Sequence, residues 1–506
     1  MTIEVQATAA LARPDRTTLL IYLSALTAMF MAVLDMNIVV TAMPTIAHEL
    51  GDVSLLGWVG AAYLLSTAAV SPFYGKLGDM YGRKSIVAFA VAAFVAGSLL
   101  CGLAWSMPSL IAARVLQGIG GGGLMVSAFA MIGELFEPRE RAKYQGYSSI
   151  VFTLGSVVGP VGGGYLTDLL GWRSVFLVNL PVGIAVLAAI ALFMQRKPAT
   201  AHHKIDILGG VLLAIGTVAI VYWSNHALET QGLDLWTILL PVIGIVAIVA
   251  FVLVERRAAE PIVPLRLFAN KTISLVVIAS TLSGMVTLGL YFYFALFMQM
   301  VTRLAPGPLG LLFLPMSIAV AVTSVAAGRL MAATGKYKYL PIAGMALGAA
   351  LMVAYAFMDD HTPLWAIGLT FLAFGISMGL SMQTMMVAIQ TAAPLKDIGA
   401  ATGLATQART IGASLGLGIN GGIMALGLGG ATAALPATVA SAVPGGLASL
   451  TPRSLEALPD SVREMALNAY AHGFGPTYWF AGAIYLAATV LLLFLPNNQI
   501  PKHNAR

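Results

Sequence analysis

A single carboxylate, Asp35, lies deep inside an apolar run from Leu19 to Ile46 that carries no other charge. A run of this length can cross a bilayer, which takes about 20 residues. A carboxylate at that depth costs about 2.5–3.5 kcal/mol on insertion scales, so an acid in such a place is a candidate for function by default. Asp35 is therefore the first residue in this chain to be considered for chemistry.

Arg114 is the predicted partner of Asp35. It lies about six residues, or roughly 9 Å, from the outer end of its own apolar run, and Asp35 lies about nine residues, or roughly 14 Å, from Pro44. Both side chains fall in the outer half of the membrane, where a buried acid and a buried base at similar depth are expected to pair. Protonation of Asp35 would weaken this ion pair, which would make the pair sensitive to proton binding. A static salt bridge is the structural alternative.

The segment from Gly75 to Lys84 places glycines, one acid and three cations at the end of an apolar run. Gly75 and Gly82 permit tight turns and close helix contact. Asp79 can accept hydrogen bonds from Arg83 or from a facing helix end, which predicts a latch that breaks as two parts of the protein rock apart. A basic loop that only sets the orientation of the chain is the alternative.

Glycines also predict close packing inside the apolar runs. Gly118, Gly120 and Gly123 match the GxGxxG spacing of dinucleotide sites, but that pattern needs a preceding strand and a βαβ unit. Here the pattern lies within an apolar run that begins near Arg114, so we interpret it as a smooth helix face for close packing.

A second glycine-rich segment contains Gly155, Gly159, Pro160 and Gly163. Gly155 and Gly159 form a GxxxG seam, and Pro160 removes one helix hydrogen bond. The segment is predicted to be a close-packed hinge face, and a static packing seam is the alternative.

Further polar residues inside apolar runs are candidates for lining a substrate pocket. They are Gln117, Tyr147, Tyr291, Gln383 and Gln407. Packing between helices is the alternative for each of them. Arg409 is a second cation inside an apolar run, with no acid near it in the sequence. It is expected either to bond backbone carbonyls or to attract an anionic group on a substrate.

The composition limits the class of protein that carries these residues. Of 506 residues, 59% are hydrophobic and 9% are charged, whereas a soluble domain has nearer 25% charged residues. The apolar residues come in blocks of about twenty, which predicts an all-α polytopic membrane protein rather than an alternating β-barrel. One cysteine excludes an internal disulfide. No metal, nucleophile or nucleotide motif is present, so we expect no enzyme activity, cofactor or metal.

The apolar blocks predict fourteen transmembrane helices. They cover Leu19–Met43, Trp58–Tyr74, Ser85–Leu103, Leu110–Phe136, Tyr144–Leu170, Val175–Met194, Ile207–Asn225, Trp236–Val254, Ile273–Met300, Leu309–Ala333, Leu340–Phe357, Leu364–Ala392, Ala400–Leu428 and Phe474–Leu495. The outer segment from about Gly429 to Gly473 is expected to be a connection, in which Thr451–Tyr470 could form a short surface helix.

The positions of the basic residues predict the orientation. With both termini in the cytoplasm, 21 of the 27 Lys and Arg residues fall in cytoplasmic segments and 4 in outer loops. This ratio fits the positive-inside rule and assigns the chain to the cell (inner) membrane as a multi-pass protein. The net charge of +6 is thereby explained without a nucleic-acid partner. The partners that we expect are the lipid bilayer, protons and a small-molecule substrate, and the chain is expected to be a monomer.

Two weak repeats predict an internal duplication. Gly75 and Gly82 recur 253 positions later as Gly328 and Gly335, where Ala332 replaces the acid. Three glycines that begin at Gly146 recur 257 positions later. Nearly equal offsets indicate two related bundles, which is a transporter architecture with its site between the halves. The predicted division is a six-helix bundle over residues 1–200, two inserted helices over 201–262, and a second six-helix bundle over 263–506.

Taken together, these segments resemble the major facilitator superfamily, and within it the fourteen-spanner branch of drug:proton antiporters. The loop at 75–84, the span-four segment 114–123 and the segment 155–164 look like signatures of the superfamily and its antiporters. Segments 34–44, 171–181 and 264–268 look like marks of the branch. The resemblance implies a major-facilitator fold and export of small amphipathic compounds driven by inward proton flow. It makes Asp35 the proton-coupling acid and Arg114 its partner.

Two other functions remain open at this point. The same fold could export a lipid or a lipid-linked metabolite that enters sideways, and a membrane enzyme or sensor lacks any supporting motif. The helices expected in the C-terminal half contain no further acid, unlike those of some relatives that export organic cations, so a preference for dications is not expected.

Overall fold

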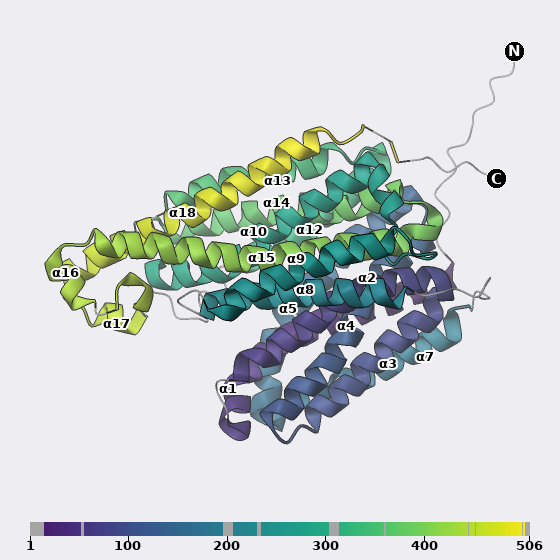
Figure 1. The fold of residues 1–506 in the computed structure, drawn as a ribbon, viewed down its shortest axis with the longest axis horizontal. Coiled ribbons are helices and arrows are strands. Elements are labelled where there is room, and N and C mark those ends of the chain that lie inside the picture. The colour runs from purple at the N-terminus through teal and green to yellow at the C-terminus, as the bar shows by residue number, and fades with distance from the viewer. Residues whose placement is uncertain are drawn as a thin grey trace, which may run out of the picture.

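The computed structural model describes residues 15–51, 55–195, 206–229, 234–302, 313–358, 361–443, 445–450, 452–497 and 499–500. Within these ranges the secondary structure is helical, apart from one isolated β-bridge between Lys336 and Gln499. The all-α fold class predicted from the apolar blocks is confirmed (Figure 1).

The long helices follow the predicted apolar runs. They are α1 (Arg16–Leu50), α2 (Leu56–Tyr81), α3 (Arg83–Gly102), α4 (Met107–Leu135), α5 (Pro138–Leu170), α7 (Asn179–Phe193), α8 (Ile207–Glu229), α9 (Leu235–Glu255), α10 (Lys271–Thr302), α12 (Leu314–Thr334), α13 (Tyr339–Ala356), α14 (Leu364–Ala392), α15 (Ile398–Ala433) and α18 (Asp460–Leu493). Shorter elements are α6 (Ser174–Leu177), η2 (Leu265–Ala269), η3 (Leu395–Asp397), α16 (Ala437–Ala442), η4 (Leu447–Ser449) and α17 (Pro452–Glu456).

Twelve helices in the described residues are long and apolar enough to cross a membrane. The protein is therefore a multi-span membrane protein. The other two predicted spans correspond to α2 and α10, which form helices of 26 and 32 residues but are not among the twelve. The total of fourteen stays a prediction. The first predicted domain boundary, between residues 200 and 201, lies outside the described residues, and the division into three parts also stays a prediction.

The helices pack in two groups with α8 and α9 beside them (Figure 1). In the first group α1 packs on α4 and α5, and α4 also packs on α2 and α3. In the second group α10 packs on α15, α12 on α14, and α13 on α14 and α18. Helix α8 contacts α9, α2 and α15, so it lies against one helix of each group.

Glycines allow the close contacts within the first group. A Cβ on Gly120 would lie 2.3 Å from the backbone nitrogen of Phe94 in α3, and one on Gly118 would lie 2.5 Å from the carbonyl oxygen of Tyr63 in α2. No side chain larger than hydrogen fits at either position. The interpretation of this glycine run as a packing face, rather than a nucleotide loop, agrees with these contacts.

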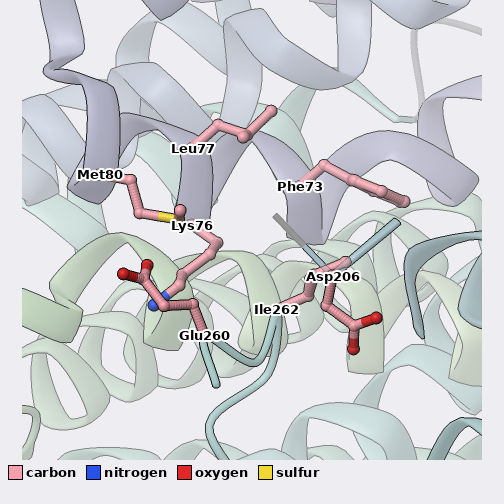
Figure 2. Close-up of a pocket in the computed structure, with 7 residues that line it drawn as sticks. All are labelled: Phe73, Lys76, Leu77, Met80, Asp206, Glu260 and Ile262. Atoms are coloured by element: carbon pink, nitrogen blue, oxygen red, sulfur yellow. The ribbon is translucent and has the colours of Figure 1, made fainter. Parts of the chain in front are cut away.

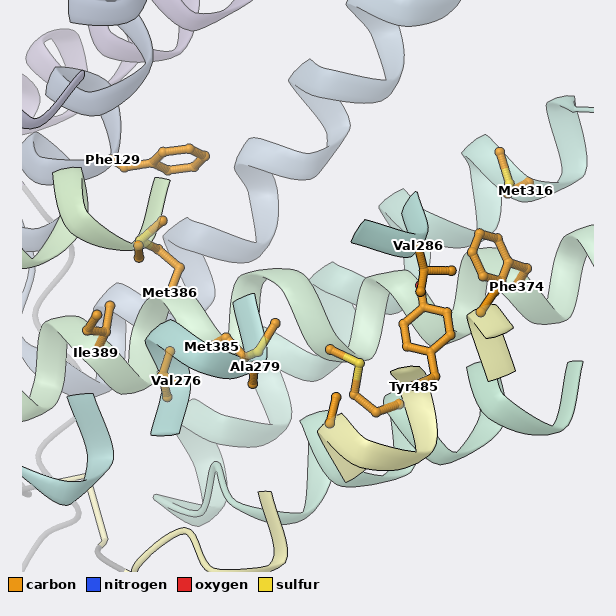
Figure 3. Packing of buried hydrophobic residues seen from close by; sticks show 14 of the residues in the cluster. Phe129, Val276, Ala279, Val286, Met316, Phe374, Met385, Met386, Ile389 and Tyr485 are labelled. Carbon is orange, nitrogen blue, oxygen red and sulfur yellow. The ribbon is translucent and has the colours of Figure 1, made fainter. Parts of the chain in front are cut away.

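The core of the second group is rich in methionine and aromatic residues. Figure 3 shows part of the largest buried cluster, with Met385 and Met386 of α14 and Tyr485 of α18. The ring of Tyr485 lies 6.3 Å from that of Phe374 in α14. Phe129 of α4 belongs to the same cluster, so the apolar core is continuous between the two groups.

The two groups meet at one end of the molecule, which we call the basic end because Lys76, Arg83, Arg139 and Arg141 lie there. Arg141 Nη1 donates to the carbonyl oxygen of Gln390 at 3.1 Å, and Arg139 Nε donates to that of Ile500 at 3.4 Å. Toward the opposite end α1 diverges from the second group (Figure 1). Among the described residues most hydrogen bonds and ion pairs between the two groups lie at the basic end, and Thr153 Oγ1 of α5, which donates to the carbonyl oxygen of Ser317 in α12 at 3.1 Å, lies nearer the opposite end. The bundle is therefore closed at its basic end.

The segment before the last span differs from the prediction. Instead of a separate surface helix over Thr451–Tyr470, α18 runs without interruption from Asp460 to Leu493, and α15 extends to Ala433. The reason is a continuous buried face: Tyr470 is buried and its ring lies 5.0 Å from that of Phe474. Polar residues on the outer face of this helix hid that continuity in the sequence.

Candidate functional site

The predicted ion pair between Asp35 and Arg114 is present in the structure. Arg114 Nη1 lies 2.6 Å from Asp35 Oδ2, and both side chains are fully buried, with 0% and 2% exposure for Asp35 and Arg114. Arg114 also donates from Nη1 to Gln117 Oε1 at 2.7 Å and from Nε to the carbonyl oxygen of Val59 at 3.1 Å. The pair thus joins α1 to α4 and is tied to α2.

The second carboxylate oxygen of Asp35 accepts from two amides. Gln117 Nε2 donates to Oδ1 at 2.7 Å, and Asn179 Nδ2 donates to Oδ1 at 2.9 Å. Gln117 Nε2 is also 2.7 Å from Ser98 Oγ. Every described partner of the Asp35 carboxylate is a donor, so the carboxylate form satisfies all of these contacts.

Sequence reasoning missed two members of this network. Asn179 was noted only as part of a branch signature, and Ser98 was not singled out. The available signal was a polar amide at the start of an apolar helix, since Asn179 begins α7. Gln117, a predicted pocket residue, is fully buried, at 0% exposure, and bonds to both Asp35 and Arg114, and its assignment to a pocket stays a prediction.

Aromatic rings enclose the cation of this network. The Arg114 guanidinium carbon lies 4.3 Å from the ring centroid of Tyr63 and 5.8 Å from that of Phe176. An arginine over an aromatic face gains about 0.5–2 kcal/mol, more where water is excluded. These contacts hold the guanidinium in one place while Asp35 faces it.

At the basic end Asp79 joins the two groups of helices. Its carboxylate accepts from the backbone amides of Gly399 at 3.1 Å and Ala400 at 2.9 Å, at the first turn of α15, where unpaired amides favour a negative charge. Arg83 forms an ion pair with Asp79 and a second one with Glu134 at 2.7 Å. Both partners predicted for Asp79, Arg83 and a facing helix end, are therefore present.

Two glycines allow the backbone to adopt the geometry of this contact. A Cβ on Gly75 would lie 2.2 Å from the carbonyl oxygen of Gly399, so α2 and α15 touch backbone to backbone. Gly82 has φ +85°, a left-handed conformation that separates α2 from α3 and that glycine adopts at little cost. Its role in a conformational latch stays a prediction.

The second copy of the motif makes a different contact. Gly328 packs against α5, where its Cβ would lie 2.3 Å from the carbonyl oxygen of Ala142. Arg329 Nη2 donates to the hydroxyl of Tyr147 at 3.2 Å, and its guanidinium lies 5.8 Å from that ring. Tyr147, expected in the pocket, thus lies at the contact between α5 and α12.

The glycines of the segment 155–164 face α1. A Cβ on Gly155 would lie 2.8 Å from Val33 Cγ1, and one on Gly163 would lie 2.5 Å from the carbonyl oxygen of Ile38. Gly159 makes a similar approach, at 2.7 Å from Asn37 Cβ. Pro160 lies inside the continuous helix α5. The close-packed seam is present, whereas movement about it stays a prediction.

The remaining pocket candidates do not gather around one cavity. Gln407 Nε2 donates to Thr217 Oγ1 of α8 at 2.6 Å. Gln383 is buried in α14, with 2% exposure, and the side chain of Tyr291 lies outside the described residues. Arg409 has no hydrogen bond to a backbone carbonyl in the part of the chain that the structure describes. Their assignment to a substrate pocket stays a prediction.

A small hollow lies at the basic end, between α2, the residue that precedes α8 and the segment that follows α9 (Figure 2). Its lining residues are Phe73, Lys76, Leu77, Met80, Asp206, Glu260 and Ile262, around a cavity of about 10 Å³. Small-molecule sites usually enclose about 300–1,000 Å³. In the described residues, no group of three or more His, Cys, Asp or Glu side chains is placed to hold a metal ion.

The helical fold agrees with the sequence comparisons. The family description Major Facilitator Superfamily matches residues 25–417, and the chain belongs to this family of transporters.

Several relatives extend over most of the chain. The MFS-type transporter Rv1877 of Mycobacterium tuberculosis is 35% identical over 91% of this chain, and the match spans 66% of that relative. Multidrug transporter protein MdtP of Bacillus subtilis is 35% identical over 78% of this chain and 73% of its own length. Efflux pump dotC of Dothistroma septosporum is 31% identical over 92% of this chain and 82% of its own length.

Solved structures show the same fold at low sequence identity. The crystal structure of the human organic anion transporter MFSD10 has a TM-score of 0.64 at 12% identity, with 94% of this chain and 99% of that chain covered. The proton:xylose symporter XylE has a TM-score of 0.59 at 15% identity, with 96% and 97% covered. The expected major-facilitator fold is confirmed.

Proposed function

We propose that this protein is a proton-coupled antiporter that exports small amphipathic compounds, including drugs and toxic metabolites, by alternating access. The observation that carries the proposal is the buried network around Asp35, in which a titratable carboxylate is bonded to Arg114 inside an apolar span. A carboxylate of this kind is a functional site by default, and proton relays are a common use of it in transporters.

The hydrogen bonds give protonation a structural consequence. A proton on Asp35 Oδ2 would face Arg114 Nη1, donor against donor, at a position where 2.6 Å now separates the two heavy atoms. A proton on Oδ1 would face the amides of Gln117 and Asn179 in the same way. Binding a proton removes the negative charge and therefore weakens the contacts between α1 and its neighbours α4 and α7, which links the proton to helix arrangement.

The contacts at the basic end provide the second requirement, a gate. Under the positive-inside rule the basic end faces the cytoplasm, so the closed basic end corresponds to an outward-facing state. We assign Asp79, Arg83, Gly75 and Gly82 to a latch that stabilises this state and that opens when substrate loads from the cytoplasm. Each pH unit across the membrane supplies about 1.4 kcal/mol per proton for this cycle.

The relatives support export of small compounds over other cargo. Two of those that match more than 70% of their own length carry the printed names multidrug transporter and efflux pump. We accordingly propose that the chain acts in the cell (inner) membrane, with both termini in the cytoplasm and as a monomer, and that it contributes to resistance against antibiotics or other toxic compounds.

Export of a lipid is the alternative on this fold, and the position of α8 argues against it on one side. A lipid would enter sideways between the two groups of helices. Helix α8 lies against both α2 and α15, with Gln407 bonded to Thr217 and Tyr222 of α8 5.2 Å from the ring of Trp58 in α2. The seam between α2 and α15 is therefore covered by protein over this length.

The proposal is tested with purified full-length protein in sealed proteoliposomes. A fluorescent amphipath is preloaded, an inward or outward pH gradient is imposed, and compound movement and internal pH are recorded together. Antiport is expected to move the compound and protons in opposite directions, and to stop when an uncoupler collapses the gradient. Compound movement that ignores the gradient would rule out proton coupling, and movement of a labelled phospholipid instead would favour the alternative.

A further inference from the structure

Arg409 is the deepest cation of the second helix group, and the network around Asp35 does not involve it. It lies 11 positions after Ile398, the first residue of α15, which places it roughly 17 Å along the helix axis. The hydrocarbon core of a bilayer is about 30 Å thick, so the Arg409 backbone lies near its middle.

The neighbours of α15 define the direction of the Arg409 side chain. Gly403 approaches α2, Gln407 bonds to α8, and Gly412 approaches Thr281 of α10. At about 100° per residue, Arg409 projects on the side opposite Gln407, between the directions that face α2 and α10. The side chain therefore points away from α8, on the face of α15 that lies between its contacts with α2 of the first group and α10 of the second.

The charge of Arg409 has no described counterpart. Its side chain lies deep in the protein but is partly exposed. Among the residues that the structure describes, no carboxylate, carbonyl or hydroxyl accepts a hydrogen bond from it. Arg114 is the opposite case: it is 2% exposed and is bonded to Asp35, Gln117 and Val59.

The sequence supplies no acid that could pair with Arg409 after a small movement of its own group. No Asp or Glu occurs between Glu260 and Asp359, or between Asp397 and Glu456, so α10, α12, α13 and α15 contain none, and α14 contains none either. Asp35, in the first group, is already bonded to three donors. An arginine inside a membrane protein costs about 2.5–3.5 kcal/mol on insertion scales and usually marks a substrate or ion path.

We propose that Arg409 binds the anionic group of an exported compound, such as a carboxylate attached to an apolar body. A guanidinium forms charge-assisted and often bidentate hydrogen bonds with a carboxylate, and these are about twice as strong as neutral ones. The proposal deepens the proposed export function and rests on it for its physiological meaning. It specifies a substrate class, amphipathic organic anions, and separates the anion site from the proton site at Asp35.

Binding of matched probes tests the proposal. Full-length protein in nanodiscs of zwitterionic lipid is titrated with 1-pyrenebutyrate, with its uncharged amide and with the trimethylammonium analogue, and pyrene fluorescence is followed. Wild type is expected to prefer the carboxylate. Arg409→Gln should weaken carboxylate binding by about tenfold or more, which corresponds to the loss of one charged hydrogen bond, and leave amide binding unchanged. Arg409→Lys should restore part of the preference.

Lys271→Gln is the matched control, because it removes one positive charge from the exposed first residue of α10. It should bind all three probes as wild type does. Retained amide binding by Arg409→Gln shows that this variant is folded. Equal affinity of wild type for carboxylate and amide, or an equal loss of both in Arg409→Gln, would overturn the proposal.

Two further measurements distinguish the source of the anion and the dependence on export. Competition by phosphatidylglycerol in wild type but not in Arg409→Gln would assign the site to a lipid phosphate and overturn the substrate assignment. In proteoliposomes, Arg409→Gln should still export the amide against a proton gradient while export of the carboxylate falls. Export of every probe without regard to charge would refute the anion site alone, whereas absence of proton-driven export in wild type would refute the proposed function.

Discussion

Replacing Asp35 by asparagine tests the central network most directly. The aspartate accepts hydrogen bonds from Arg114, Gln117 and Asn179. Asparagine keeps one oxygen and replaces the other by an NH₂ donor. If the oxygen stays with the two amides, the NH₂ group faces the Arg114 guanidinium; if it turns to Arg114, the NH₂ group faces two donors. Neither orientation satisfies all three partners.

The magnitude follows from the burial of the partner. Arg114 is 2% exposed, so Asp35→Asn leaves a buried cation without its counter-charge. Breaking a buried ion pair by removing one partner costs about 3–5 kcal/mol. Adding Arg114→Gln removes the isolated cation. The double variant should therefore lose less unfolding free energy than the two single variants together, by about 0.5–3 kcal/mol.

Cys101 provides the assay. It is the single cysteine of the chain, it is buried, and its Sγ lies 3.4 Å from Gln117 Oε1. A thiol-reactive dye should label it only when the region around the network opens on heating. Asp35→Asn should shift the labelling midpoint to lower temperature and abolish proton-driven antiport. Asp168→Asn, at an exposed acid of α5, should change neither.

Two results would refute the reasoning. If Cys101 of the Asp35→Asn variant is labelled at the same temperature as in wild type, the ion pair does not contribute to stability as the burial of Arg114 requires. If the same variant exchanges substrate for protons at the wild-type rate, Asp35 is not the coupling acid, and the pair is a static salt bridge.

Three further predictions concern the helix contacts. Gly163→Ala should destabilise the protein by about 1–3 kcal/mol because its Cβ would lie 2.5 Å from a backbone oxygen of α1, whereas Gly164→Ala, with nothing within 4 Å, should not; dye labelling on heating distinguishes them. Asp79→Ala should open the basic end, so that a cysteine at Thr406 on α15 reacts faster with a maleimide; an unchanged rate would exclude the latch. Hydrogen bonds from Thr237 and then His226 lower the pKa of Asp234 to about 2. Because the folded pKa is depressed, its stabilisation is present above the ordinary value of 3.8 and is lost as pH falls toward 2. Asp234→Ala should therefore lower thermal stability at pH 7, and an equal loss at pH 2 would contradict this account.

The sequence contained the information that depends on depth and local pattern. Asp35 and Arg114 were identifiable because a charge in an apolar run is costly wherever the run packs. Their pairing followed from equal depth. Gly75, Asp79 and Gly82 were identifiable as a contact motif for a similar reason. Glycines and a lone acid at a helix end have few structural roles other than close contact and acceptance of hydrogen bonds.

Tertiary packing decided which residues from distant parts of the chain complete these sites. Asn179 lies 144 positions from Asp35, and the first turn of α15 lies 320 positions from Asp79. The direction in which a helix faces depends on its neighbours, and a membrane span that is apolar on all sides does not encode it. The sequence therefore did not indicate that Gln117 bonds to Arg114 or that Tyr147 bonds to Arg329.

The sequence by itself determined that this chain is a helical membrane protein with one costly acid, a matching base and glycine-rich contact faces. It did so because insertion into a bilayer sets length, composition and charge limits that act on each segment separately. Only the tertiary structure decided that the bundle is closed at its basic end, that α8 covers one seam, and that Arg409 has no described partner. These facts depend on the relative positions of helices that share no local sequence.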